Sequence, residues 1–437
     1  MLTWKRIQIG LIHAAVAITL VPINSTLNRI MIEDLGIPAT LVVLLFSLPY
    51  LISFIQIAIG SFSDSHPVMG YRRSPYILIG LLLCVAGLLM STRVALTLSE
   101  NFWAGLGLGL LTYGAWGMGF NFASVAYFSL ASEISGENGR SKTTAIMFFI
   151  MIVSIIISSA GLSHMLQPFS DQALQRSFVL IAMVALVMGL IGLIGLEKRS
   201  VIAKTDHRYS LHSIVGEILS HKQTTLFFLY LIMMLAAILG QDVLLEPFAA
   251  RAFGLPVNAT TRITTIWGVC YLLSLVVTGL LEGKAAKITV VRMASLGAIL
   301  AFLLIAASGL STQLGLFYAG VVLLGLATGP ATVANLSLML DMTVPGKVGL
   351  FIGAWGTASA LARFLGSFTT AVVRDMVNQS PETAVTGYVL AFATQVLFLG
   401  ISLVILSRVS VDAFRKQAAE PLAEASVIRL AAVDGEV

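Results

Sequence analysis

Twelve stretches of about 20 mostly apolar residues dominate this sequence. They lie near residues 8–30, 38–62, 75–95, 103–131, 143–163, 178–196, 224–248, 262–282, 288–309, 314–340, 349–374 and 386–408. In a bilayer core about 30 Å thick, a helix of about 20 residues pairs all its backbone polar groups internally. The sequence therefore predicts an all-α integral membrane protein with twelve transmembrane helices. Strand-length alternation, which a membrane barrel requires, is absent from the sequence.

The composition agrees with a chain surrounded by lipid. Hydrophobic residues make up 57% of the 437 positions and charged residues only 11%, whereas soluble domains carry about 25% charged residues. The net charge of +5 comes from basic residues spread over short loops, so membrane lipid is an expected partner and nucleic acid is not. Lys and Arg concentrate in the loops that share a side with the N-terminus, which predicts that both termini are cytoplasmic.

A polar stretch divides the chain midway. We expect an N-terminal six-helix bundle over residues 1–196, a cytoplasmic linker over 197–222, a C-terminal six-helix bundle over 223–408 and a cytoplasmic tail over 409–437. The histidines of the linker match no zinc-ligand spacing, so we predict no metal site there.

The two halves repeat each other. Segment Ala123–Glu133 reads ASVAYFSLASE and segment Ala331–Asp341 reads ATVANLSLMLD, with five of eleven positions identical. Arg29, after the first helix, corresponds to Arg251 after the seventh, and each is followed by a Gly-x-Pro sequence. Similarity at a half-chain offset is typical of duplicated transporter folds. It predicts two pseudo-symmetric six-helix bundles, with any substrate site at their interface.

Helix 7 carries the densest group of charges inside an apolar segment. Gln241, Asp242 and Glu246 lie near its outer end, with Arg251 just beyond. Asp242 and Glu246 share one helix face, where two carboxylates favour a cation, a proton or an arginine between them. They form either a substrate or proton-coupling site, or a helix end paired with Arg251 and Arg29. Arg363, in the middle of helix 11, needs a partner, for which Asp242 and Glu246 are candidates.

The loop after the second helix contains Gly60 and Asp64, followed by Gly70 and the pair Arg72-Arg73. This loop resembles the signature loop of the major facilitator superfamily, although it is longer than usual. The resemblance implies that Asp64 braces a cytoplasmic gate near Gly349 at the start of helix 11, where the helix dipole favours a carboxylate. Chain orientation is a second explanation for the two arginines. The predicted gating residues are Gly60, Asp64, Arg72, Arg73, Glu133 and Arg140.

A more specific resemblance begins in helix 7, at Gly240-Gln-Asp-Val-Leu-Leu-Glu-Pro-Phe248 and the following Phe253-Gly-Leu-Pro256. Supporting segments are Thr26–Met31, Ser132-Glu133, Gly139-Arg140 and Met151–Ser159. Together they resemble the bacteriochlorophyll-delivery branch of the superfamily, the PucC/LhaA type found in phototrophs. The resemblance implies a part in assembling light-harvesting complexes, by handing (bacterio)chlorophyll to newly inserted pigment proteins.

The function expected from this resemblance is a membrane carrier or assembly factor that handles (bacterio)chlorophyll. It would lie in the cytoplasmic, intracytoplasmic or thylakoid membrane of a phototroph. Its partners would be the pigment or a precursor, bound without covalent attachment, and light-harvesting or photosystem subunits. Alternatives are a proton-coupled small-solute transporter and a scaffold for light-harvesting subunits that transports nothing. The sequence contains no nucleophile–base pair or nucleotide loop, so we expect neither an enzyme nor catalytic residues.

Isolated polar residues inside the helices are weak candidates for pigment ligands. His13, Gln56 and Asn121 could each ligate the magnesium of a porphyrin. Single polar residues in membrane helices more often hydrogen-bond a neighbouring helix. The sequence does not decide between these two roles.

Overall fold

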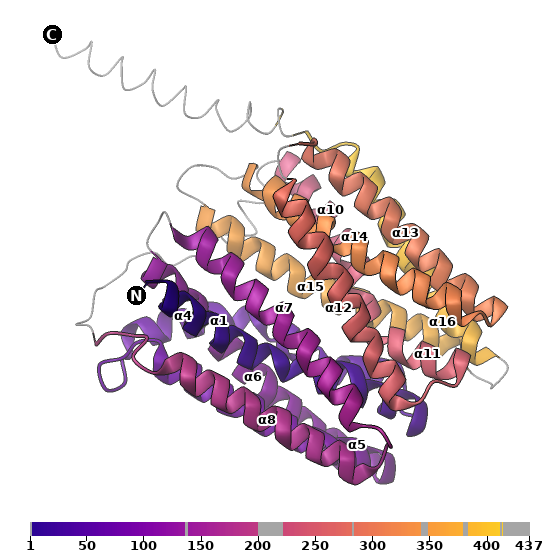
Figure 1. Ribbon diagram of the computed structural model, residues 1–437, viewed down its shortest axis with the longest axis horizontal. Helices are drawn as coiled ribbons and strands as arrows, with labels where there is room; N and C mark the ends of the chain where they lie inside the picture. Colours follow the sequence, from indigo (N-terminus) through magenta and orange to yellow (C-terminus); the bar gives the residue numbers. More distant parts are fainter. Residues whose placement is uncertain are drawn as a thin grey trace.

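The computed structural model describes residues 2–135, 139–199, 222–281, 284–341, 348–378, 383–410 and 413. Within these ranges the secondary structure is helical, apart from an isolated bridge between Val68 and Tyr71. The helices form twelve crossings, which confirms the predicted all-α membrane fold (Figure 1).

The crossings of the first half run from Leu2 to Leu193. They are α1 (Leu2–Ile18) with the π-helical turns η1 (Pro22–Leu27) and η2 (Ile30–Asp34); α2 (Ala39–Phe46), α3 (Leu48–Leu51), the 3₁₀ turn η3 (Ser53–Ile55) and α4 (Gln56–Ser65); α5 (Ser74–Glu100); α6 (Phe102–Ser135); α7 (Arg140–Met165); and α8 (Asp171–Leu193). The first helix begins before the predicted residue 8 because Lys5 and Arg6 lie within it, donating to the Leu196 carbonyl and to Thr143.

The crossings of the second half run from Lys222 to Leu406. They are α10 (Lys222–Gly240), the 3₁₀ turn η5 (Gln241–Val243) and α11 (Leu245–Phe253); α12 (Val257–Leu280); α13 (Lys287–Ser311); α14 (Leu314–Asp341); α15 (Val348–Val377); and α16 (Ala384–Leu406).

Nine helical segments of the described chain are long and apolar enough to cross a membrane by themselves. The other three crossings are interrupted or more polar: α2 to α4 is broken, α6 carries Tyr113, Trp116 and Asn121, and α15 carries Arg363. The three polar side chains of α6 are buried inside the N-terminal bundle. Neighbouring helices thus replace the lipid that such side chains would otherwise meet.

The helices pack as two groups (Figure 1). Crossings α1 to α8, drawn in indigo to magenta, form one bundle, and α10 to α16 form the other. They meet along two seams, one between α7 and α12 and one between α2 and α15. We call the side that holds Leu2 and Lys222 the near side, and the side that holds Asp34 and Phe253 the far side. Because successive crossings alternate in direction, Ser410 returns to the near side.

Corresponding ion pairs occur in the two halves. Arg73, just before α5, lies 3.1 Å from Glu133 near the end of α6. Lys287, the first residue of α13, lies 2.6 Å from Asp341 at the end of α14. Glu133 and Asp341 are also the last residues of the two repeated segments. The duplication predicted from sequence therefore extends to side-chain pairing.

The second crossing is broken around Pro49. A proline donates no hydrogen bond and crowds the preceding turn, so carbonyl groups near it lose helical partners. Asn121 Nδ2 of α6 donates to the Pro49 carbonyl oxygen at 3.0 Å, and Gln56 Nε2 donates to Asn121 Oδ1 at 2.6 Å. Gly117 permits this approach, because a Cβ there would lie 2.8 Å from the Pro49 nitrogen.

The seventh crossing is broken before Pro247. This residue has no N–H to donate to the Val243 carbonyl, four residues earlier. Asn28 Nδ2, from the other bundle, donates to that carbonyl oxygen instead. The break therefore joins the two bundles and places Gln241 and Asp242 at their interface.

Candidate functional site

A cavity of 310 Å³ lies between the two bundles. Its walls come from α1, η1 and α7 on one side, and mainly from α10, α12, α14 and α15 on the other. Most of the lining is apolar, and its charged residues are Asp242, Glu246 and Arg363. Ligand pockets usually measure about 300–1,000 Å³. In this conformation the cavity therefore accommodates a small ligand or one part of a larger one.

Arg363 pairs with Asp242 at the cavity wall. Its guanidinium also lies over the Tyr50 ring, 5.3 Å from the centroid, and so contacts both bundles. The backbones of α10 and α15 approach closely here, because a Cβ on Gly240 would lie 2.6 Å from the Gly366 carbonyl carbon. An arginine inside a membrane needs such a carboxylate. Of the two acids considered from the sequence, the structure selects Asp242.

Two further polar side chains of helix 7 lie beside this pair. Glu246 accepts a hydrogen bond from Thr264 Oγ1 at 2.6 Å through Oε1. Gln241 Nε2 donates to Asp242 Oδ1 at 2.7 Å. Glu246 and Gln241 are each only 3% exposed, although both line the cavity. The predicted candidates Gln241, Asp242, Glu246 and Arg363 therefore lie together.

Arg29 and Arg251 form their ion pairs elsewhere, so of the two alternatives for helix 7 the one that pairs its acids with these arginines is wrong. Arg29 pairs with Asp34 at the end of the same crossing. Arg251 Nε lies 2.7 Å from Glu33 Oε2. Both arginines lie toward the far side, where Asp34 and Glu33 are their ion-pair partners.

Glu33 is the centre of a network that sequence reasoning missed. It accepts from Arg251 of α11, from Arg374 Nη2 of α15 at 3.1 Å and from the Tyr388 hydroxyl of α16. Arg374 also lies over the Tyr388 ring, 5.0 Å from its centroid. The side chains of Glu33 and Arg374 are 5% and 6% exposed. One residue of the first crossing thus joins three helices of the other bundle. The only indication of this network in the sequence was the pair of adjacent acids Glu33-Asp34 at the end of that crossing.

Asp375 makes a second connection on the far side. Its carboxylate accepts from Ala39 N at 3.2 Å and from Thr40 N at 2.7 Å, at the N-terminus of α2. A carboxylate there satisfies free N–H groups and favours the helix dipole. Along the other seam, Ser163 Oγ donates to the Asn258 carbonyl at 2.7 Å. Hydrogen bonds and ion pairs that join the bundles between described residues all lie on the far side.

Three of the predicted gating residues meet within the N-terminal bundle on the near side. Arg73 donates to Glu133 Oε1 at 3.1 and 3.2 Å and to Ser63 Oγ at 2.7 Å. Arg72 Nη2 lies 3.6 Å from Glu133 Oε2. Gly60 lies in α4, and its carbonyl accepts from Ser63 at 3.0 Å. The side chains of Asp64 and Arg140, and any contact near Gly349, lie outside what the structure describes.

Glu197 supports this near-side group and was not identified from sequence. Its carboxylate accepts from the backbone N–H of Arg72, Arg73 and Ser74 at 2.7 to 3.2 Å. It therefore caps the N-terminus of α5, which Ser74 begins. From the sequence we assigned Glu197 to the linker, because nothing in the sequence around a single acid after an apolar segment indicates that it caps a helix far away along the chain.

The three weak pigment-ligand candidates do not belong to the cavity lining. His13 packs against the rings of Tyr127, Phe128 and Phe148, with centroids 5.0, 5.5 and 5.1 Å away. Gln56 and Asn121 hydrogen-bond each other at the break in the second crossing. This bond is the interhelical role that the sequence offered as the alternative to ligation.

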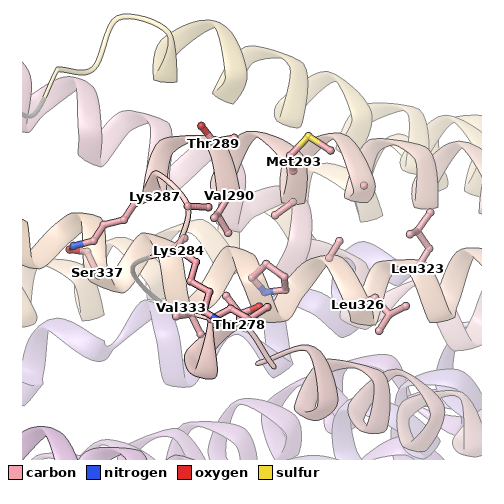
Figure 2. A pocket seen from close by; sticks show the side chains of 17 residues that line it. Thr278, Lys284, Lys287, Thr289, Val290, Met293, Leu323, Leu326, Val333 and Ser337 are labelled. Atoms are coloured by element: carbon pink, nitrogen blue, oxygen red, sulfur yellow. The ribbon is translucent and has the colours of Figure 1, made fainter. Parts of the chain in front are cut away.

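A groove of 540 Å³ lies on the C-terminal bundle between α12, α13 and α14 (Figure 2). Its lining is mostly apolar, with Lys284 and Lys287 near its near-side end. Lys287 is already paired with Asp341. Met293, in the groove wall, is 64% exposed, so the groove opens outward to where lipid would lie. We therefore take the smaller cavity between the bundles as the candidate functional site.

Comparison with known proteins gives a family and several full-length relatives. The family model described as PUCC protein matches residues 26–414. An uncharacterized protein from the puhA-bchM intergenic region of Rhodobacter capsulatus is 28% identical over 420 residues, which cover 92% of this chain and 88% of that protein. Protein PucC of Cereibacter sphaeroides is 26% identical over 420 residues, or 92% and 91% of the two chains. The bacteriochlorophyll synthase 44.5 kDa chain of Rhodobacter capsulatus is 26% identical over 409 residues, or 91% and 93%.

Solved structures share the fold at low sequence identity. A mutant of nucleoside transporter NupG superposes with a TM-score of 0.73 at 14% identity, covering 92% of this chain and 99% of that one. A bacterial homologue of the human lysosomal transporter Spinster, inward-facing and unoccupied, gives 0.71 at 12% identity, covering 95% and 98%. These likenesses establish the major facilitator fold and carry no information about substrate.

Proposed function

This chain belongs to the PUCC protein family, and we propose that it is a membrane carrier that holds (bacterio)chlorophyll between its bundles and delivers it for assembly of light-harvesting complexes. The names of two relatives, Protein PucC and a bacteriochlorophyll synthase chain, support a role in making photosynthetic complexes. The fold, shared with solute transporters, supports a carrier.

The cavity between the bundles is the observation that carries this proposal. Its walls are apolar over most of their area, and its charged side chains gather in its far-side part, around Asp242 and Glu246. A (bacterio)chlorophyll has apolar ring faces and a hydrocarbon tail, with a metal centre and carbonyl groups as its polar features. An amphiphile of this kind needs a mostly apolar site with a few fixed polar groups.

The distribution of contacts between the bundles suggests how the pigment enters. The described bonds between the bundles lie on the far side, beyond the cavity. Carriers of this fold work by rocking one bundle against the other around a fixed central site. We propose that the seams part on the near side, which widens the cavity enough for the pigment ring.

Pigment content of the purified protein tests the proposal. The protein is extracted gently from a phototrophic host, and its absorption spectrum is recorded beside those of two variants of α10. Leu235 lines the cavity, so Leu235→Trp fills it, whereas Leu229 is 44% exposed, so Leu229→Trp is the matched control. We expect stoichiometric (bacterio)chlorophyll in the wild type and the control, and its loss from Leu235→Trp. Absence of pigment from the wild type, or equal pigment in all three, contradicts the proposal.

A proton-coupled small-solute transporter is the second candidate, because the pair Asp242–Arg363 places a carboxylate in the cavity wall. It predicts pigment-free protein that takes up a solute along a proton gradient, with uptake abolished by Asp242→Asn. A scaffold that transports nothing predicts a third result. Light-harvesting subunits then co-purify with the wild type and with Leu235→Trp alike, and pigment is absent from the cavity.

A further inference from the structure

The groove between α12, α13 and α14 extends over one half of the membrane thickness. Figure 2 shows Lys287 and Ser337 at one end of it, with Leu323 and Leu326 toward the other. Leu323 and Ser337 are 14 positions apart in α14, which is about 21 Å at 1.5 Å per residue. One leaflet of a bilayer is about 20–22 Å thick with its headgroups, half of the total thickness. The groove therefore matches the near-side leaflet in length.

Small side chains leave space along the floor of this groove. α14 packs against both α12 and α13, which make little contact with each other among the described residues. Ala294, Ala327 and Ala334 line the groove and are only 5%, 6% and 4% exposed. Met293 and Leu326 border it and are 64% and 42% exposed, so it opens toward the surrounding membrane. Its shape suits a hydrocarbon chain that lies along the protein surface.

The near-side end of the groove is positively charged. The charged residues of its lining are Lys284 and Lys287. Lys287 is neutralised by Asp341, 2.6 Å away. Lys284 is exposed and has no ion pair or side-chain hydrogen bond among the described residues. The N-cap of α13 is Ala286, whose side chain cannot accept from the N–H groups of the first turn. One uncompensated positive charge and a helix N-terminus together favour a phosphate with a single negative charge.

We propose that this groove binds one anionic phospholipid of the near-side leaflet, with an acyl chain along α14 and the phosphate beside Lys284. Basic pockets between membrane helices bind anionic lipid headgroups. A transmembrane helix of a partner protein would instead follow the full core of about 30 Å. The groove ends at Leu323, nine positions and about 13 Å from the far-side start of α14 at Leu314. The lipid site is independent of the proposed pigment handling.

Native mass spectrometry of the purified full-length protein tests the headgroup contact. The protein is titrated with phosphatidylglycerol and with phosphatidylcholine that carries the same acyl chains. Lys284→Gln is compared with Lys222→Gln, which removes an exposed lysine at the near-side start of α10, outside the groove. We expect the wild type to prefer phosphatidylglycerol. Lys284→Gln should lower that affinity about fivefold, the effect of one lysine at an anionic lipid surface, and leave phosphatidylcholine within about twofold. Lys222→Gln should bind like the wild type.

A second pair of variants tests the acyl chain. Val333 lines the groove, so Val333→Trp fills part of it. Leu300 of α13 is 52% exposed and lies outside the lining, so Leu300→Trp is the matched control. We expect Val333→Trp to weaken binding of both lipids several-fold and Leu300→Trp to leave it unchanged. Thermal melting shows that each variant is folded. If Val333→Trp is not folded, Leu326→Trp at the exposed border of the groove takes its place.

Three results would overturn the lipid site. Equal affinity of the wild type for the two lipids, or equal losses in Lys284→Gln and Lys222→Gln, would leave only a general attraction between charges. Unchanged lipid binding in the folded tryptophan variant would place the acyl chain outside the groove. Glycerol phosphate has a phosphate and no acyl chain. If it raises the melting midpoint as much as phosphatidylglycerol does, the ligand is a soluble phosphate. Pigment takes no part in these experiments, so failure of the lipid site leaves the proposed function standing.

Discussion

Two glutamates, Glu33 on the far side and Glu133 on the near side, each contact two arginines, but they join different parts of the molecule. The partners of Glu33, Arg251 and Arg374, belong to the opposite bundle. Those of Glu133, Arg72 and Arg73, belong to its own bundle. The side chain of Glu33 is 5% exposed and that of Glu133 is 37% exposed.

The difference shows which motions the described contacts resist. On the far side, separating the bundles means breaking the buried ion pair of Glu33 with Arg374 and the bonds of Asp375 to the N-terminus of α2. On the near side, the described ion pairs of Glu133 and Asp341 each lie within one bundle, so they do not join the two bundles. Among the described residues, the hydrogen bonds and ion pairs between the two bundles therefore hold the far side together, and opening that side would require breaking them.

The largest effect is expected from Glu33→Gln. Breaking a buried ion pair costs about 3–5 kcal/mol, and because Arg374 keeps Asp375 at 2.8 Å we expect about 2–3 kcal/mol here. Thermal melting in detergent would measure the loss as a lower midpoint. A midpoint equal to that of the wild type would show that Glu33 does not hold the far side.

The same variant should expose the far-side seam. Ser163→Cys, in a background with Cys84 and Cys270 replaced by alanine, reports on the seam because Ser163 is 9% exposed and bonds the Asn258 carbonyl. We expect a membrane-impermeant maleimide to label this cysteine slowly, and several-fold faster once Glu33→Gln is added. Equal labelling rates would count against a closed far side.

A smaller effect on stability is expected from the ion pair Asp242–Arg363 in the cavity wall. Asp242→Asn and Arg363→Gln should each lower stability, because each leaves a charge in the cavity wall without its partner. The double variant should lose less than the sum, with a coupling free energy of about 1–2 kcal/mol. A double-mutant cycle on melting data gives this value. Strict additivity would mean that the two charges do not interact in the folded protein.

Asp375→Ala should cost about 1 kcal/mol, the usual value of a side chain that caps a helix N-terminus. It removes the acceptor of the Ala39 and Thr40 N–H groups across the α2–α15 seam. Asp375→Asn keeps one side-chain oxygen but no charge. Comparing the melting of Asp375→Ala with that of Asp375→Asn therefore separates the contribution of the helix cap from that of the charge. Unchanged stability in both variants would remove Asp375 from the far-side closure.

The smallest effect is expected from Glu133→Gln. Ion pairs of partly exposed groups contribute about 0–1 kcal/mol, and this pair joins helices of one bundle. The variant should melt close to the wild type and leave labelling of Ser163→Cys unchanged. Faster labelling would show that the near-side group controls the far side, contrary to the comparison between the two glutamates.

The sequence predicted the helices and the duplication because both depend on local pattern. A membrane segment is recognised by its length and apolar character. The duplication is recognised by matched positions in the two halves, such as Glu133 and Asp341. It also predicted that Arg363 needs an acid from helix 7, since an arginine in lipid has few alternatives. That expectation succeeded because the chain places few acids inside its apolar segments.

The far-side network escaped prediction because its members are distant in sequence. Glu33 bonds Arg374, 341 residues away, and Tyr388, 355 residues away, and no spacing rule connects them. Arg251 was paired with the nearest acids along helix 7, whereas the break before Pro247 and the packing of the first crossing bring Glu33 to it.

Distances between spin labels at the two ends of one seam test most directly whether the far side stays closed while the near side opens. Labels on α7 and α12 at His164 and Arg262 report on the far end, and labels at Lys142 and Leu280 report on the near end, all four positions being exposed. We predict a narrow far-end distance distribution with and without bacteriochlorophyll, and a broad near-end distribution that shifts when pigment is added. A broad far end with a narrow near end, or two ends that both ignore pigment, would contradict a carrier that loads through its near side.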